Sequence, residues 1–429
     1  MSPQKALPLI NETLHTFTVP SGLAVAVIPR PGFKKIYATF ATHYGSIDNH
    51  FRPPGEAAVE VPDGIAHFLE HKMFEKADGG DVFDDFARVG ASANAYTDYS
   101  TTTFLFSTTQ HFWEAFSVLL EFVQRPYFTP ENVEKEKGII EQEIRMYLDM
   151  PSDRLHSHLM RALYQVHPAR IDIAGTVESI RTITPEALYR CYQTFYHPSN
   201  MLVTVIGDVD PQQVVETVAR DQERRGLSAK GRIERIFPPE PAEVATPRVE
   251  HRMSVARPLL MVGYKDVPEV PGWSRLEREV VAGLTLGMLV GPSSPLYERL
   301  YGEGLINERF SARYTQDDSF AFAALGGETP DPDRLEETLT RELPLAPLRE
   351  EDLERLKRKE LGSFVTLFQI PEDLAYLYNH LHFRGLDLLQ YPEVLEGVTL
   401  ERVEAFRQLF TRPERRAVSV IRPLAEPGP

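Results

Sequence analysis

The chain has 429 residues, which is too long for one compact core and predicts at least two domains. Its 42% hydrophobic and 25% charged residues are the proportions of an ordinary globular protein. The net charge of −16 excludes a nucleic-acid binder and a surface that seeks anionic membranes, because both functions need a basic face.

The N-terminal residues contain no continuous apolar segment followed by a small-residue cleavage site. No stretch of the chain approaches about eighteen consecutive apolar residues, the length that a membrane-spanning helix needs. The single cysteine, Cys191, leaves no partner for an internal disulfide. We therefore expect a cytoplasmic protein that does not span a membrane.

The N-terminal half begins with strand-like segments rich in aromatic and β-branched residues. Helical patterns follow, and the longest of them opens at Thr129-Pro130-Glu131, with the cap, the early proline and the early acid that are typical of a helix start. The expected order is strands at 23–30 and 36–46, helices at 64–75 and 81–89, a strand at 101–109, helices at 112–125 and 131–148, and a strand at 201–209.

The C-terminal half repeats this order of elements. The expected elements are a strand at 258–267, helices at 274–288 and 295–301, a strand at 319–327, helices at 350–368 and 371–384, and a strand at 417–423. A period near two hundred residues indicates duplication of a domain and not a solenoid.

The fold class predicted from this order is α+β, with two homologous α/β domains that arose by internal duplication. Each domain would have an antiparallel-rich sheet flanked by helices. Residues 221–252 are charged and proline-rich and have neither a helical nor an alternating pattern, so we expect them to be a linker. The predicted domains are therefore 1–220 and 253–429.

Residues that can carry chemistry concentrate in the segment GIAHFLEHKMF, which starts at Gly64. His67 and His71 are four apart on a predicted helix, so both imidazoles leave the same face and can share one metal ion. Glu70 flanks that face and can reach a water in the open position of the metal. This H-x-x-E-H order is a signature of zinc peptidases. The alternative is a chance match, expected in roughly one chain in a few tens of this length.

A catalytic zinc site needs a third protein ligand. The segment KEKGIIEQEIRMYLDMP offers Glu136, Glu141 and Glu143 on one predicted helix. Glu136 and Glu143 are seven residues apart and share a face, whereas Glu141 points away from them. Two acids on one face fit a ligand with its hydrogen-bonded partner, although a solvated acidic stripe would look the same.

Four segments in the same order give the chain a resemblance to a known family: HFLEHKMFEK, GASANAYTDYSTTTF, VEKEKGIIEQEIRMYLDMP and FYHPSNMLVTVIGDVD. The chain resembles the pitrilysin/insulinase/mitochondrial-processing-peptidase family of inverted-motif zinc peptidases, and within it the zinc-bearing bacterial subunits of about this length. The resemblance implies one zinc ion held by His67, His71 and Glu143. It also implies that Glu70 is the general base acting on a zinc-activated water, and that Glu136 is a second acid hydrogen-bonded near the metal.

The resemblance extends to the peptide-binding segment. Ala93, Asn94 and Ala95 match the edge strand that pairs with an extended substrate backbone in this family. In the C-terminal half, the stretch that corresponds to HFLEH reads GLTLGMLVGPSS and has neither histidine nor acid, so we expect only one half to carry metal.

A further family segment aligns with SPLYERLYGEGLINERF, where an arginine and a tyrosine orient the substrate in other members. Those places hold Tyr301 and Asn307 here, while Arg299 and Tyr314 are nearby but out of phase. Family members of this size work as two-chain assemblies. We therefore expect a heterodimer with a homologous metal-free subunit that supplies the missing pair, and a homodimer is the second possibility.

Three functions from different classes remain open. The first is a zinc metalloendopeptidase that hydrolyses unfolded peptides. The second is a non-catalytic scaffold or recognition subunit of a processing complex. The third is a metal-dependent amidohydrolase of another class. The complete set of His67, Glu70, His71 and Glu143 favours the peptidase, because a scaffold has no physical need for all four residues.

Overall fold

The computed structural model describes residues 4–7 and 12–424. The chain forms two compact units, and each is assembled from three separate segments. Unit 1 is drawn from Met1–Ile144, Asp172–Ile236 and Val365–Gly385. Unit 2 is drawn from Arg145–Ile171, Phe237–Phe364 and Leu386–Pro429.

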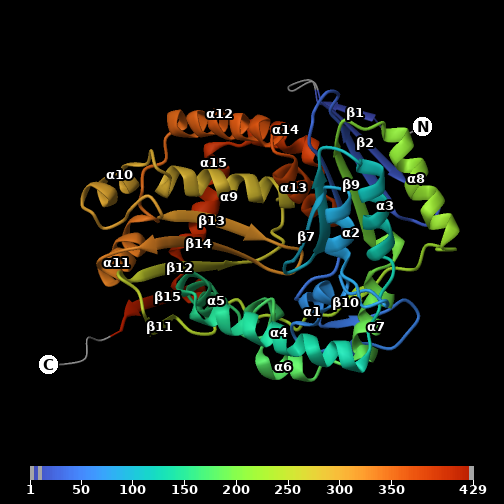
Figure 1. Cartoon of the computed structure of the whole chain (residues 1–429). Coiled ribbons are helices and arrows are strands. Elements are labelled where there is room, and N and C mark those ends of the chain that lie inside the picture. The colour runs from blue at the N-terminus through green and yellow to red at the C-terminus, as the bar shows by residue number, and fades with distance from the viewer. Residues whose placement is uncertain (1–3, 8–11, 425–429) are drawn as a thin grey trace. The chain divides into compact units, whose positions relative to one another are not determined.

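Unit 1 is built on a mixed sheet that has seven strands among the described residues. They are β1 (Gln4–Leu7), β2 (Glu12–Thr18), β3 (Ala24–Pro29), β4 (Ile36–Thr42), β7 (Ser92–Thr97), β8 (Thr102–Thr108) and β9 (Met201–Gly207). The spatial order is β1-β2-β3-β9-β4-β8-β7. Figure 1 labels β1, β2, β9 and β7 of this sheet. Neighbouring strands are antiparallel except β3 and β9, which run parallel. A small antiparallel sheet, in the order β10-β5-β6, joins β5 (His50–Arg52), β6 (Val59–Glu60) and β10 (Glu234–Arg235).

Helices cover both faces of the seven-stranded sheet. The helical elements of unit 1 are α1 (Ile65–Lys72), α2 (Val82–Arg88), α3 (Phe112–Phe122), α4 (Pro130–Asp149, up to Ile144 in this unit), α6 (Val177–Arg181), α7 (Pro185–Phe195), η2 (Pro198–Asn200), α8 (Pro211–Arg224) and α13 (Pro371–Phe383). Phe40 and Val203 point into the core against which α3 and α8 pack. The neighbouring Thr39 and Thr204 point to the other face, where both are hydrogen-bonded to Asn379 of α13.

Unit 2 has a five-stranded sheet among the described residues. Its strands are β11 (Arg248–Met253), β12 (Leu259–Asp266), β13 (Ser311–Gln316), β14 (Ala321–Glu328) and β15 (Arg416–Pro423). They follow the order β11-β15-β12-β14-β13, and only β11 and β15 run parallel. The helical elements are α5 (Pro151–Leu163), η1 (Pro168–Arg170), α9 (Arg275–Val290), α10 (Pro295–Gly302), α11 (Pro332–Glu342), α12 (Glu350–Leu367), η3 (Leu388–Gln390), α14 (Tyr391–Gly397), α15 (Leu400–Arg407), η4 (Gln408–Thr411) and η5 (Pro413–Arg415).

The strand orders confirm the predicted fold class and the duplication. Five neighbouring strands of unit 1, in the order β3-β9-β4-β8-β7, match the order β11-β15-β12-β14-β13 of unit 2. In each set the last strand in the sequence, β9 or β15, lies between the first two and runs parallel to the first. The strands and helices predicted from the sequence are all present, with bounds that differ by a few residues. Runs rich in aromatic, β-branched and other apolar residues indicated these strands, and the central ones, such as β4 and β9, are buried on nearly every residue.

An exchange of helices was not predicted. Helix α13, from the C-terminal half, covers β4 and β9 of unit 1, and helix α5, from the N-terminal half, covers β12 and β15 of unit 2. Gly263 of β12 permits this second contact, because a Cβ there would lie only 2.9 Å from Leu159 of α5. The units are therefore not the contiguous domains 1–220 and 253–429, whose boundaries stay a prediction. Between α8 and β11, the described chain contains one short strand, β10, inside the expected linker 221–252.

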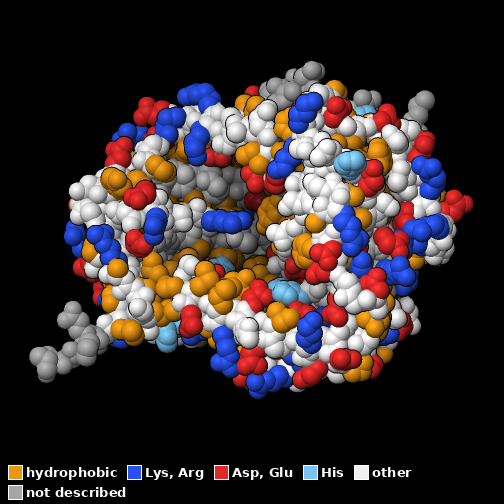
Figure 2. All heavy atoms as spheres, viewed as in Figure 1, with side chains coloured by type: hydrophobic (Ala, Val, Ile, Leu, Met, Phe, Trp, Pro, Cys, Tyr) orange, Lys and Arg blue, Asp and Glu red, His pale blue; other side chains and the backbone are white. Residues whose placement is uncertain are grey.

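Two features concern expectations about partners: the apolar length of the helices and the distribution of charge on the surface. Within residues 4–7 and 12–424, no single helix is both long and apolar enough to cross a membrane, and one bent pair, α9 with α10, meets those criteria by length and composition only. On the face shown in Figure 2, acidic and basic side chains of the described residues are interspersed, and no extended basic patch is visible.

Candidate metal centre

The start of α1 is held in place by a close backbone contact. Gly64, which precedes the helix, has φ 84°, a conformation that suits glycine. A Cβ at this position would lie 2.3 Å from the carbonyl oxygen of Ala174. Ser179 Oγ also donates a hydrogen bond to the carbonyl of Asp63 at 2.8 Å. Because Phe68 and Leu69 are fully buried, the helix presents His67 and His71 away from the core.

His67, His71 and Glu143 come together although 72 residues separate the second and third in the sequence. Glu143 Oε1 lies 3.6 Å from His67 Nε2, and Glu143 Oε2 lies 3.4 Å from His71 Nε2. Donors bound to one tetrahedral zinc at about 2.0–2.1 Å lie roughly 3.3 Å apart, so this donor set fits the ion. Among the described residues, it is the one cluster of three or more His, Cys, Asp or Glu side chains with ligand spacing.

The two histidines have different electrostatic environments. Burial, with the nearby charge of His71, lowers the pKa of His67 to about 3, so its imidazole is neutral and able to bind a metal. Burial also opposes protonation of His71, but its hydrogen bond to Glu136 and the surrounding carboxylates outweigh burial and raise its pKa. His71 Nδ1 lies 3.1 Å from Glu136 Oε1, so it donates to this carboxylate while Nε2 faces Glu143. His67 Nδ1 is buried and has no hydrogen-bond partner among the described residues.

Glu70 lies beside the three predicted ligands with only 8% of its surface exposed. Burial raises the pKa of Glu70 to about 7, although the hydrogen bond from Thr97 and the charge of His71 act in the opposite direction. Thr97, the last residue of β7, donates from Oγ1 to Glu70 Oε2 at 2.7 Å. A carboxylate with a pKa near 7 can accept and release a proton at neutral pH, as a general base must.

A cavity of about 460 Å³ adjoins this group within unit 1. Its lining includes Glu70, His71 and Asn94, together with the apolar side chains of Phe74, Phe83 and Ile139. Ala93, Asn94 and Ala95 lie in β7, which is the end strand of the sheet and, among the described residues, has a strand partner on one side only. The cavity is therefore open to an extended chain that pairs with β7.

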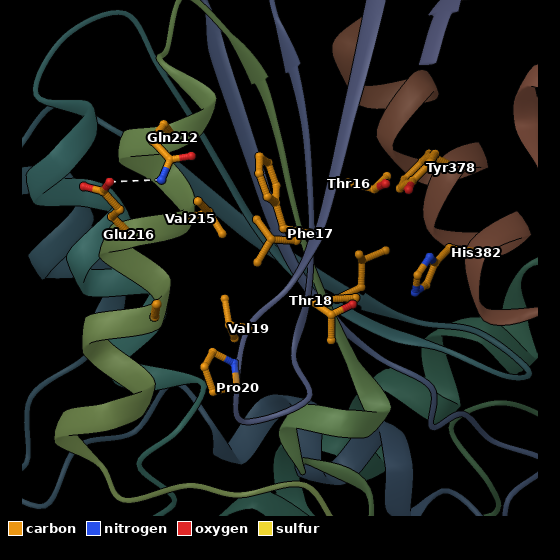
Figure 3. A pocket seen from close by; sticks show the side chains of 14 residues that line it. Thr16, Phe17, Thr18, Val19, Pro20, Gln212, Val215, Glu216, Tyr378 and His382 are labelled. Atoms are coloured by element: carbon orange, nitrogen blue, oxygen red, sulfur yellow. Dashed lines mark hydrogen bonds between the residues drawn. The ribbon is translucent and has the colours of Figure 1, made fainter. Parts of the chain in front are cut away.

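A larger cavity, of about 670 Å³, is lined by residues of β2, β3, α8 and α13 among others (Figure 3). Figure 3 shows Gln212 and Glu216 of α8 on one side and Tyr378 and His382 of α13 on the other, with Phe17 between them. Glu216 is the one carboxylate in its lining, and it accepts a hydrogen bond from Gln212. Four strands separate β2 from β7, so this cavity is not part of the candidate metal centre.

In unit 2, the residues at and near the positions where the family resemblance places an arginine and a tyrosine make contacts of their own. Tyr301 of α10 is 51% exposed, and Asn307 donates to Glu328 at 2.9 Å. Arg299 is paired with Glu303, directly after α10, and with Glu342 of α11, and Tyr314 donates to Asp266 at 2.8 Å. Both side chains therefore have partners within unit 2.

Sequence reasoning missed three residues that contact the predicted site or position it: Gly64, Lys72 and Thr97. A glycine directly before a helix is a visible signal, and Thr97 shares a strand face with Ala93 and Ala95 in the alternation of β7. Lys72 gave no signal, since lysine is ordinarily a surface residue.

Comparisons with known proteins identify a family of peptidases. The sequence model described as "Insulinase (Peptidase family M16)" matches residues 58–177, and that described as "Peptidase M16 inactive domain" matches residues 182–360. The zinc protease YmfH of Bacillus subtilis is 44% identical over 418 residues, which are 96% of this chain and 97% of that protein.

Solved structures are similar over nearly the whole chain. The crystal structure of an M16-like peptidase from Alicyclobacillus acidocaldarius superposes with a TM-score of 0.92 at 39% identity, covering 98% of this chain and 100% of that one. The crystal structure of pitrilysin has a TM-score of 0.74 at 15% identity and covers 97% of this chain and 46% of that one. The second comparison shows a shared fold only.

Proposed function

Because the chain belongs to the insulinase family of peptidases, peptidase family M16, we propose that it is a zinc-dependent endopeptidase acting on unfolded peptides. One observation carries the proposal: His67, His71 and Glu143 converge beside a buried Glu70 at the edge of an open cavity. A scaffold subunit would gain nothing from this convergence, because clustered acids and imidazoles cost stability unless they bind something.

The residues take the following roles. His67, His71 and Glu143 would hold one zinc ion, which when bound supplies a Lewis acid that polarises a peptide carbonyl and acidifies water. Glu70 accepts a proton from the attacking water and then passes it to the leaving nitrogen. Thr97 holds the Glu70 carboxylate at the cavity edge through its hydrogen bond.

The substrate class follows from the edge strand. An extended peptide can pair with Ala93, Asn94 and Ala95 of β7 only if it is unfolded, because the pairing uses backbone groups that a folded chain has already satisfied. Phe74, Phe83 and Ile139 offer an apolar surface to a side chain next to the bond that is cut. Phe83 and Ile139 are 42% and 47% exposed, which leaves apolar area for a substrate to cover.

We also propose that the active form contains a second, metal-free homologous subunit. Tyr301 and Asn307 occupy the places of the arginine and the tyrosine in the resemblance, so this chain lacks groups that orient the substrate. A partner would supply that pair. A heterodimer explains the loss more directly than a homodimer, in which both copies would lack it.

The test combines zinc content with peptide cleavage. The samples are the chain alone, the chain with a homologous subunit, a chelator-treated control, and the variants Glu70→Gln, Glu143→Gln and Glu141→Gln. Glu70→Gln should keep zinc but lose activity about 10²–10⁴-fold, and Glu143→Gln should lose both. Glu141 lies on the same helix and is paired with Arg181 at 3.0 Å, so its variant should retain zinc and activity.

The outcomes separate the candidate functions. If the parent binds no zinc, or if Glu70→Gln cleaves as well as the parent, the peptidase proposal is wrong and the scaffold function replaces it. If zinc is bound and amides that are not peptides are cleaved in preference, the amidohydrolase alternative holds. Activity of the chain alone at the level of the mixture would refute the need for a partner.

A further inference from the structure

Lys72, the last residue of α1, has a fully buried side chain. A lysine at the end of a helix ordinarily extends its amine to solvent, because a buried cation loses its hydration. The flanking residue Met73 and the nearby Leu69 are buried apolar side chains, so an apolar residue would also pack at this position. The buried charge therefore points to a requirement other than packing.

The ammonium group of Lys72 lies between two carboxylates. Its Nζ donates to Glu75 Oε2 and lies 3.5 Å from Glu136 Oε2. The other oxygen of Glu136, Oε1, is the atom that accepts from His71 Nδ1 at 3.1 Å. Glu136 thus divides its two oxygens between Lys72 and His71, and its side chain is only 11% exposed.

Two contacts fix a carboxylate more firmly than one. With both oxygens engaged, the plane of the Glu136 carboxylate cannot rotate without breaking one of the contacts, and both involve charged or polar donors. The orientation of Glu136 sets the orientation of the His71 ring, because the hydrogen bond at Nδ1 directs Nε2 toward Glu143 at 3.4 Å. Without Lys72, Glu136 keeps only the contact with His71 and can turn toward the cavity that it lines.

We propose that Lys72 is a positioning residue of the metal centre, which acts through Glu136 to hold His71 in the orientation that binds zinc. The proposal rests on the proposed function, since it concerns the same site. It assigns to a buried lysine outside the ligand set a role in metal affinity.

The test measures zinc affinity by competition with a chelating dye, and the geometry of the site by the visible absorption of the Co²⁺-substituted protein. Lys72→Met should weaken zinc binding about 10–100-fold, the range typical when a group behind a metal ligand is lost, and should change the Co²⁺ spectrum. Lys76→Met is the matched control, because Lys76 is ion-paired with Asp85 at 3.0 Å and does not contact Glu136. That variant should bind zinc within about twofold of the parent.

A double variant shows whether Lys72 acts through Glu136. In the Glu136→Gln background, Lys72→Met should change zinc affinity less than threefold, because the contact through which Lys72 acts is already lost, whereas two independent effects would multiply. If Lys72→Met alone does not fold, a difference of more than threefold between Glu136→Gln and Lys72→Met/Glu136→Gln still overturns the inference.

Three results would overturn the inference: parent-like affinity and spectrum in Lys72→Met, effects that multiply in the double variant, or an equal loss in Lys76→Met. A parent chain that binds no zinc would instead refute the proposed function. A parent that binds zinc while Lys72→Met binds it equally well refutes only the role of Lys72.

Discussion

Replacing Thr97 by valine removes one hydrogen bond from the candidate general base and changes little else. Thr97 Oγ1 donates to Glu70 Oε2 at 2.7 Å, and valine has nearly the same shape as threonine. The neighbouring hydroxyl of Thr102 keeps a partner, because it donates to the carbonyl of Tyr44 at 2.9 Å. The substitution therefore isolates the effect of one donor on the Glu70 carboxylate.

The expected magnitude follows from the charge on the acceptor. A hydrogen bond to an ionised group contributes about 1.5–3 kcal/mol, and about 1.4 kcal/mol corresponds to one pKa unit, so the pKa of Glu70 should rise by about one to two. The pKa of Glu70 is already raised to about 7 by burial. At pH values well below the pKa of Glu70 in the zinc-loaded protein, the ionised fraction, and with it kcat/KM, should fall about 10- to 100-fold. A bound divalent cation lowers the pKa of Glu70 in the parent and in the variant alike, so the difference between them is the quantity to measure.

The assay is the pH dependence of kcat/KM for a fluorogenic peptide, with zinc content measured in parallel. The acid limb of the Thr97→Val profile should move to higher pH, and its rates should approach those of the parent at high pH, where Glu70 is ionised in both. Thr97→Ser retains the hydroxyl and should keep the parent profile. A uniform loss at every pH, or the same profile in both variants, would refute the reasoning.

Three further predictions concern stability and specificity. Gly64→Ala should destabilise the fold by about 2–5 kcal/mol and weaken zinc binding, because its Cβ would lie 2.3 Å from the carbonyl oxygen of Ala174 and its φ is 84°. Gly79→Ala is the control: its φ is 81° but the space around it is open, so thermal unfolding should show only the smaller loss of stability that backbone strain causes. Burial lowers the pKa of His167 from 6.5 to about 4, so the unfolded state binds a proton at this histidine more readily than the folded state, and the free energy of unfolding falls as the pH drops from 6.5 toward 4. In a pH series of urea unfolding, His167→Gln should lose about 2 kcal/mol less of its free energy of unfolding at pH 5 than the parent does. An unchanged pH dependence would contradict this. Phe83→Ala should reduce about tenfold or more the preference, as a ratio of kcat/KM, for peptides with phenylalanine over alanine beside the scissile bond, because it removes a wall of the cavity; an unchanged ratio would show that the side chain binds elsewhere.

The parts of the site that could be predicted from the sequence depend on spacing within one element. His67 and His71 share a face of α1 because four residues make about one helical turn, and Glu136 shares a face of α4 with Glu143 for the same reason. The choice of Glu143 over Glu136 as the ligand came from the resemblance and not from the spacing. In the structure, the oxygens of Glu143 face the Nε2 atoms of His67 and His71, and the choice of ligand stays a prediction.

The parts that could not be predicted depend on contacts between distant segments. Helix α5 was not predicted from the sequence, and its apolar face, which includes Leu155, Leu159 and Leu163, does not by itself show which sheet the helix covers. The contact of Thr97 with Glu70 needs the register of β7 against α1, which local patterns do not determine. Lys72 lies in the same quoted segment as the ligands, yet its burial appears only when Glu75 and Glu136 approach it from two sides.

The duplicated halves show why one fold carries the metal group only once. In unit 1, helices α1 and α2 come between strands β4 and β7 in the sequence. In unit 2, helices α9 and α10 come between the corresponding strands β12 and β13, so the two pairs of helices correspond. Every residue other than glycine from Val280 to Val290 of α9 is buried, so this helix has no face left for ligands. Near its start, Arg278 and Tyr314 both donate to Asp266, a buried network that satisfies its own polar groups. Helix α1 instead leaves the side chains of His67 and His71 12% and 26% exposed and close to Glu143, in a group that could hold a metal ion. The duplication therefore preserved the sheet and its covering helices, while the first of the two helices differs between the halves: it is packed on all sides over residues 280–290 in unit 2 and presents two histidines in unit 1.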